Sequence, residues 1–187
     1  YMSREMLDVF APFLDAAVVE LKSINPETYR RYIGGELDVV LENLKDMRDR
    51  GVWVEVHTRL IPEINDSPEE QETIAGFIVE NLGPETPWHV EHFYSSFDSQ
   101  LYRPKVSPLL EKVVYLAQRA GLEHVYCRTL GAIDTLCPQC GRILIERRQP
   151  GTVTVDLVAG CCPDCGHILS GFRSDLEENK AVSGGVY

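Results

Sequence analysis

Two pairs of cysteines have the residue types and the spacing of a metal site. Each pair lies in the phrase Cys-Pro-x-Cys-Gly, first at residues 137–141 and again at residues 162–166. Two thiolates separated by two residues can bind one metal ion from a tight turn, and the glycine that follows permits the left-handed backbone of that turn. Four thiolates complete a tetrahedral coordination sphere, which predicts a structural site and not a catalytic one. The predicted ligands are Cys137, Cys140, Cys162 and Cys165.

Zinc is the metal we expect at these cysteines. Iron in a rubredoxin-like site is the main alternative, because four thiolates suit either ion. A third interpretation is a pair of disulfides, although CxxC spacing in a cytosolic protein more often indicates metal or redox work. Cys161 is a neighbour outside the ligand set, and Cys127 lies in an apolar stretch that we expect to be core.

The segment between the cysteine pairs has the pattern of a β-hairpin. Residues 142–148 and 152–158 are strand-like, and Gln149-Pro150-Gly151 supplies a turn between them. A hairpin that joins two CxxC turns is the layout of a zinc ribbon, which we predict for residues 132–173.

A second set of candidate functional residues lies on predicted strands nearer the N-terminus. Strands that are buried on both faces should be apolar on both, but here one face of each strand carries polar or ionisable groups toward its carboxyl end. In barrels of parallel strands that end holds the ligands, so we predict a polar ligand site. The alternative is a set of structural ion pairs or a solvated sheet edge. The residues are Glu20 and Lys22 in strand 15–22, His57 and Arg59 in strand 52–61, and His92 and Tyr94 in strand 88–94.

Helical segments separate these strands. An amphipathic pattern over residues 36–50 ends at Gly51, and Ser67 with Glu70 forms a capping box for a helix that runs to about Leu82. Strands alternating with helices predict βαβ units and a parallel sheet. The other expected elements are a short helix from Asn25-Pro26, a helix from Ser107-Pro108 to Gly121 and a last strand over residues 124–128.

The composition limits the classes of function. Lys plus Arg is 18 and Asp plus Glu is 29, a formal net charge of −11 for 187 residues. This acidic balance argues against a nucleic-acid binder and against a protein held on anionic membranes. No apolar run approaches a membrane span and no signal peptide is recognisable, so we expect a cytoplasmic protein.

The order of several phrases resembles one enzyme family. Residues 18–22, 32–35, 51–56, 60–62 and 65–67 together resemble the radical S-adenosylmethionine (SAM) enzymes related to pyruvate formate-lyase activating enzyme. With Pro87-Trp88-His89-Val90 and the C-terminal CPxCG pair, the chain resembles the radical SAM enzyme of the AmmeMemoRadiSam system.

This resemblance implies a partial (β/α)6 TIM-like barrel with a 4Fe–4S cluster on a CxxxCxxC loop. The family cleaves SAM reductively to a 5′-deoxyadenosyl radical, which abstracts a substrate hydrogen. The 187 residues contain no CxxxCxxC. The expectation is therefore the C-terminal half of the barrel over residues 1–131, inactive alone, followed by the ribbon and an acidic flexible tail over residues 174–187.

The resemblance also assigns residues to SAM. The family's Asp-Leu-Lys motif matches Glu20-Leu21-Lys22, with Glu in place of Asp, so Glu20 and Lys22 would contact the cofactor. His57 and Arg59 fall near SAM, and Arg59 near the adenine. The family's histidine on the next strand matches Tyr94, with His92 two residues earlier.

Partners and alternatives follow from the same observations. The substrate is a small molecule or a protein that the sequence does not identify. A half barrel leaves the edge of strand 15–22 unpaired, so we expect self-association through that edge. The alternative function is a non-catalytic zinc-ribbon adaptor or binding protein.

Overall fold

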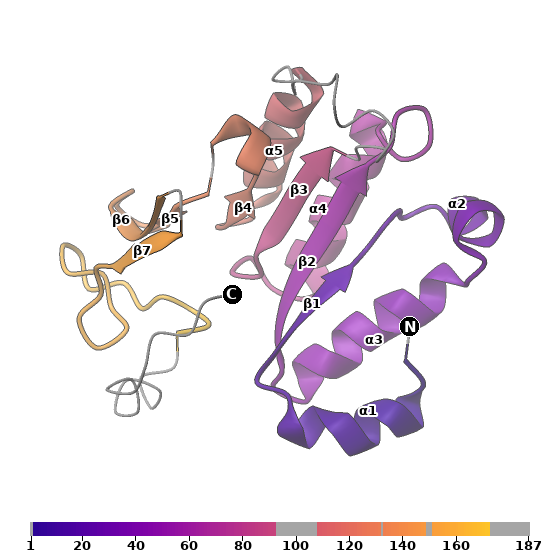
Figure 1. Cartoon of the computed structure of the whole chain (residues 1–187), viewed down its shortest axis with the longest axis horizontal. Helices are drawn as coiled ribbons and strands as arrows, with labels where there is room; N and C mark the ends of the chain where they lie inside the picture. The colour runs from indigo at the N-terminus through magenta and orange to yellow at the C-terminus, as the bar shows by residue number, and fades with distance from the viewer. Residues whose placement is uncertain (1, 93–107, 132, 149–150, 173–187) are drawn as a thin grey trace. The chain divides into compact units, whose positions relative to one another are not determined.

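The computed structural model describes residues 2–92, 108–131, 133–148 and 151–172. They form two compact units, divided between Ile133 and Asp134. Figure 1 shows the elements of each unit in order. The first unit contains α1 (Arg4–Phe10), β1 (Ala16–Glu20), α2 (Pro26–Thr28), α3 (Leu37–Asp49), β2 (Trp53–Leu60), α4 (Pro68–Asn81), β3 (Trp88–His92), α5 (Pro108–Ala120) and β4 (Val125–Tyr126); the second contains β5 (Thr135–Leu136), β6 (Ile143–Arg148) and β7 (Thr152–Val155).

The first unit is built on a four-stranded sheet in the order β1-β2-β3-β4, and every neighbouring pair is parallel. The expected alternation of strands and helices and the parallel sheet are therefore confirmed. In Figure 1, α4 and α5 lie behind β2 and β3, on one side of the sheet. Closure of a (β/α)6 barrel stays a prediction, as does the acidic tail, which lies outside the described residues.

The central strand β2 alternates strictly between buried and partly exposed residues. Val54, Val56, Thr58 and Leu60 are buried, whereas the residues between them are not. The buried side chains pack into one apolar core with helix residues such as Leu44 of α3. Because side chains alternate across a strand, this pattern fixes which face of the sheet the helices cover.

Helix ends follow the expected start signals, with one difference. The Ser67 hydroxyl accepts from the N–H of Glu70 at the start of α4, as a capping box requires. The Glu70 carboxylate, however, accepts hydrogen bonds from the Ser23 hydroxyl and, at 3.1 Å, from the N–H of Ile24. Glu70 therefore connects α4 to the loop after β1, a tertiary role that its local sequence pattern does not reveal.

None of the described helices combines the length and the apolar composition that crossing a bilayer requires.

The helix expected at Asn25-Pro26 is the three-residue α2, whose N–H at Glu27 is capped by the Asn25 side chain. It continues directly into a π-helical turn, Tyr29–Ile33, that ends at Gly34 with a positive φ of 71°.

The second unit is a three-stranded antiparallel sheet in the order β5-β6-β7. Its small core contains Leu144 and Leu169 together with Cys137 and Cys162. The expected hairpin is confirmed in β6 and β7, whose register pairs Ile145 with Val155. So few buried apolar side chains provide little hydrophobic stabilisation, which is why small domains of this kind use metals or disulfides.

Buried hydrogen bonds through Thr58 of β2 join the carboxyl end of β1 to the amino end of β3. The Thr58 hydroxyl donates to the carbonyl of Leu21 at 2.9 Å and accepts from Trp88 Nε1 at 3.0 Å. All three residues are fully buried. Each group would lose its partner in a region without water if the hydroxyl were absent.

We therefore predict that Thr58→Val lowers the free energy of unfolding by about 1–3 kcal/mol, the usual cost of leaving a buried polar group unsatisfied. Urea unfolding followed by circular dichroism measures the change. Thr73→Val is the matched control, because the exposed Thr73 hydroxyl bonds only its own helix at Glu69. Equal stabilities for the two variants would contradict the role given to Thr58.

Candidate functional site

Ionisable residues gather on the sheet face opposite the helix-covered core. The register places Glu20 beside His57, His57 beside His89, and His89 beside Tyr126. Residues in register on parallel strands point to the same side, so these side chains share a face. We call it the polar face; its members are Glu20, Lys22, Trp53, Glu55, His57, Arg59, His89, Glu91 and Tyr126.

At the carboxyl end of the polar face, one carboxylate lies between two cations. Glu20 forms an ion pair with Lys22 Nζ through one oxygen and, at 3.7 Å, with Arg59 Nε through the other. The side chains of Lys22 and Arg59 are 41% and 52% exposed. Ion pairs this accessible are weak in water, so a charged ligand can replace them at little cost.

The backbone of Lys22 is held firmly although its side chain is accessible. Its N–H donates to the Tyr29 hydroxyl at 3.2 Å, and its carbonyl accepts from Asn65 Nδ2 at 2.5 Å. Burial raises the pKa of Tyr29, so the phenol remains a neutral acceptor. Asn65 also donates to the carbonyl of Arg59 and accepts from the N–H of Ile61 at 2.6 Å. Sequence reasoning noticed Asn65 only as part of a motif and missed that it joins the ends of two strands.

His57 lies in the middle of the polar face, 3.6 Å from Glu91 and 16% exposed. Burial lowers the pKa of His57 below its ordinary value of 6.5; Glu91 acts against this shift, and Arg59 adds to it. The imidazole is therefore neutral at pH 7 and can either donate or accept a hydrogen bond.

A carboxylate–imidazole pair lies toward the amino end of the same face. His89 Nε2 donates to Glu55 at 2.7 Å, and the indole N–H of Trp53 donates to the other Glu55 oxygen at 3.3 Å. The His89 ring stacks on Tyr126 with its centroid 5.0 Å away. These contacts orient the imidazole. The sequence pattern did not reveal them, because it pointed to His92 and Tyr94 on this strand instead.

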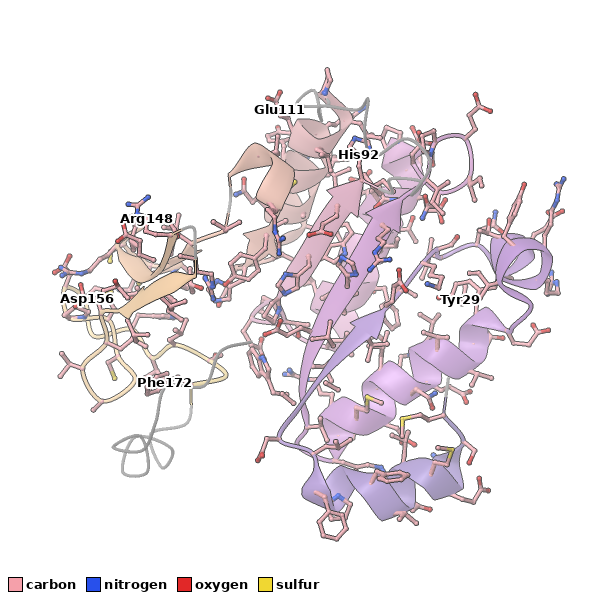
Figure 2. The ribbon with its side chains drawn as sticks, in the orientation of Figure 1. Tyr29, His92, Glu111, Arg148, Asp156 and Phe172 are labelled. Atoms are coloured by element: carbon pink, nitrogen blue, oxygen red, sulfur yellow. The ribbon has the colours of Figure 1, made fainter. Side chains whose placement is uncertain are left out.

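The structure separates His92 from the residues with which it was expected. His92 pairs in register with the buried Leu60, and it shares its parity with Trp88 and Val90, which are both fully buried. Figure 2 labels His92 at the carboxyl end of β3. The placement of His92 on the polar face is thus wrong: His89 and Glu91 occupy that side of β3. Tyr94 lies outside the described residues.

The second unit brings together the four cysteines of the two CPxCG phrases. Their sulfur atoms all lie within 4.8 Å of one another, and no other group in the described part of the chain includes Cys161 as a ligand. Two sulfur–sulfur distances are 3.5 and 3.6 Å, close to the separation of about 3.8 Å that tetrahedral bonds of 2.3 Å produce. Cys127 is fully buried in the core of the first unit, as expected.

Both cysteine turns have the same backbone hydrogen bonds. In the first, the N–H of Cys137 donates to the carbonyl of Arg142 at 2.7 Å; in the second, that of Cys162 donates to His167 at 2.8 Å. Gly141 and Gly166 adopt φ values of 77° and 75°, which L side chains rarely adopt. The glycine in each phrase is thus required by the turn.

The sulfur atoms perturb one another strongly. Burial opposes ionisation of Cys162, but the N–H groups of Cys165 and Asp164 bring the pKa of Cys162 down to about 7. The N–H of His167 lowers the pKa of Cys165, yet burial and three neighbouring sulfurs raise the pKa of Cys165 to about 12. The four sulfurs could hold one metal ion, and the donor set and spacing fit zinc or iron.

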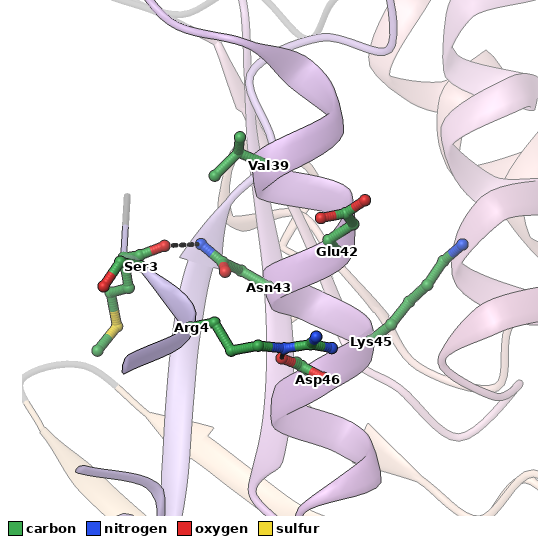
Figure 3. A pocket seen from close by; sticks show the side chains of 8 residues that line it. Ser3, Arg4, Val39, Glu42, Asn43, Lys45 and Asp46 are labelled. Carbon is green, nitrogen blue, oxygen red and sulfur yellow. Dashed lines mark hydrogen bonds and ion pairs between the residues drawn. The ribbon is translucent and has the colours of Figure 1, made fainter. Parts of the chain in front are cut away.

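A hollow of about 460 Å³ lies between the N-terminal segment and α3 (Figure 3). Its polar groups bind one another: Arg4 pairs with Asp46 at 3.4 Å, and Asn43 donates to the carbonyl of Met2 at 2.9 Å. These contacts attach the N-terminal segment to α3.

Comparisons with known proteins address the fold. No family model matches the sequence. The chain is 32% identical over 150 residues to an uncharacterized protein of Methanocaldococcus jannaschii, an alignment that covers 79% of this chain and 44% of the relative. The chain therefore spans less than half the length of that relative.

Two solved structures are similar in fold. A domain of pyruvate-formate lyase-activating enzyme from Bacteroides vulgatus has a TM-score of 0.55 at 14% identity, covering 67% of this chain and 74% of that domain. Streptococcus suis SuiB, solved bound to S-adenosylmethionine, has a TM-score of 0.51 at 13% identity, covering 95% of this chain and 45% of SuiB. The fold of this chain is thus similar to the folds of these two structures.

The lowered pKa of His57 predicts a stability that depends on pH. The unfolded histidine gains its proton near pH 6.5, whereas folded His57 resists it, so stability is complete above pH 6.5 and declines as the pH falls toward the folded pKa. Because Glu91 raises this pKa, Glu91→Gln should lower it further. Titration of the His57 ring by NMR measures the pKa of His57 in the parent and in Glu91→Gln. Glu42→Gln on α3 is the control, and a shift equal to that of Glu91→Gln would contradict the prediction.

Proposed function

We propose that the first unit binds S-adenosylmethionine on its polar face, as part of a radical SAM enzyme. The observation that carries the proposal is the group Glu20, Lys22 and Arg59 at the carboxyl ends of β1 and β2. Ligands of parallel-strand barrels bind at this end of the strands. SuiB, which has a similar fold, was solved bound to SAM.

The chemistry of these side chains suits the cofactor. Lys22 can donate charged hydrogen bonds to a carboxylate or a ribose oxygen, and Glu20 can accept from a hydroxyl or an ammonium group. Arg59 adds a planar guanidinium, and neutral His57 can bond either a donor or an acceptor. These groups would position SAM, because bond breaking in such enzymes belongs to the cofactors.

A 4Fe–4S cluster would supply the electron that cleaves SAM. The 187 residues have no CxxxCxxC, so its ligands would come from outside them, and these residues would form the C-terminal part of the barrel. The closed four-cysteine group does not suit this role, because each of its sulfurs is needed for one ion. The narrower assignment to the AmmeMemoRadiSam enzyme rests on residues 87–90 and the paired CPxCG turns.

For the second unit we propose a structural zinc ion held by the four cysteines. The sulfur spacing, the two matching turns and the very small core support it. The ion would offset the repulsion among four thiolates and replace the hydrophobic stabilisation that the small core lacks.

We predict that Lys22→Ala weakens SAM binding by about tenfold, a magnitude typical of one accessible charge-assisted hydrogen bond. Calorimetry on the gene product that contains this barrel, with its cluster reconstituted, measures the affinity. Lys112→Ala, an exposed lysine on α5, is the control and should leave the affinity unchanged. An unchanged affinity in Lys22→Ala would mean that Lys22 serves only its pair with Glu20.

The purified chain should contain about one zinc ion per molecule, because four thiolates close one tetrahedral site. Elemental analysis checks the content, and Cys137→Ser/Cys162→Ser should abolish it. Cys161→Ser is the matched control, because Cys161 lies beside a ligand and outside the cluster. Full zinc retention in the double variant, or iron in place of zinc in the parent, would refute the assignment.

A further inference from the structure

Arg142 contacts both halves of the cysteine cluster. It directly follows the first CPxCG phrase, and its backbone takes part in the hydrogen bonds of that turn. Its carbonyl accepts from the N–H of Cys137 at 2.7 Å, and its own N–H donates to the sulfur of Cys140. Through its backbone, Arg142 therefore bonds to both ligands of the first pair.

The side chain of Arg142 reaches the second turn. One guanidinium nitrogen pairs with Asp164, which lies between Cys162 and Cys165. The backbone N–H of Asp164 in turn donates to the sulfur of Cys162. A continuous chain of contacts thus runs from the first cysteine pair through one arginine to the second.

A second carboxylate fixes the orientation of this guanidinium. Nε and Nη2 of Arg142 both donate to Asp156 Oδ2, at 3.0 and 2.6 Å. Asp156 is anchored beside β7 because its N–H donates to the carbonyl of Leu144 at 2.8 Å; Figure 2 labels it in the second unit. The planar guanidinium is therefore held by the sheet on one side while it holds Asp164 with the other.

The sequence allows this ion pair in one direction only, from the first cysteine turn to the second. Gln139 occupies in the first turn the position that Asp164 occupies in the second, and His167 corresponds to Arg142. Because Gln139 carries no charge, the reverse ion pair cannot form. Arg142 is therefore the residue through which the two otherwise matching turns are joined asymmetrically.

We propose that Arg142 is a positioning residue for the metal: it holds the Cys162–Cys165 pair at ligand distance from the Cys137–Cys140 pair and slows release of the ion. The inference rests on the proposed metal site. A four-thiolate site opens when one pair moves away from the other. The ion pairs are partly exposed and add little to folding, but outer partners of metal ligands typically change affinity by about 10–100-fold.

The test is release of zinc from the intact, zinc-loaded chain to the chromophoric chelator 4-(2-pyridylazo)resorcinol. Arg142→Gln should release zinc about tenfold faster than the parent, at the lower end of that range. The matched control is Arg148→Gln in the same hairpin, whose guanidinium pairs with Glu146 and not with a cysteine turn. Arg142→Lys should be intermediate, because it keeps the charge and loses the fork.

Two further measurements separate positioning from loss of the fold. Cobalt(II) substituted into Arg142→Gln should give the parent's tetrahedral four-thiolate spectrum, which shows that the ligand set is intact. Asp164→Asn should also speed release, and adding it to Arg142→Gln should have little further effect. Release in Arg142→Gln within twofold of the parent, or equal acceleration by Arg148→Gln, overturns the role of Arg142. A parent chain that binds no zinc instead overturns the metal site itself.

Discussion

The alternation of β2 is the constraint on which the first unit depends. Its buried side chains commit one face of the sheet to the helices, and the pleat then commits Glu55, His57 and Arg59 to the other. Because parallel register keeps paired residues on the same side, the neighbouring strands must place Glu20 and His89 beside them. The alternation along this one strand thus brings together ionisable groups from three neighbouring strands.

The charged side chains of the polar face keep their positions only if the backbone that carries them is fixed. Buried amide and hydroxyl groups do this, since Thr58 and Asn65 join the carboxyl ends of neighbouring strands. The ion pairs above them are accessible and exchangeable. Rigid backbone with replaceable charges is the combination a binding site needs, because a ligand then displaces weak contacts without paying to order the loops.

Periodicity made much of this arrangement predictable. Local spacing in the sequence predicts the alternation of β2, the parallel sheet and the four-cysteine cluster. The spacing is visible in residues 52–61 and in the CPxCG phrases. The face of β3 did not follow, because a short strand with histidines at both 89 and 92 fits either parity until Trp88 and Val90 are known to be buried. The contacts of Asn65 and Glu70 with the segment after β1 could not be predicted either: those partners lie 43 to 47 residues away in the sequence and depend on the tertiary fold.

The two units differ in how far their polar groups are engaged in contacts within the protein. In the cysteine cluster all four sulfurs would be ligands, and the N–H groups of Cys137, Gly141, Cys162 and Gly166 have backbone acceptors. On the polar face, His57 is neutral and Lys22 and Arg59 are accessible, so groups remain that can exchange partners. A site whose groups already have partners keeps its contacts, whereas a site with accessible groups can exchange its contacts for contacts with a ligand. Metal binding in the second unit and ligand binding in the first are therefore expected to respond to different substitutions, since the residues that carry each belong to separate compact units.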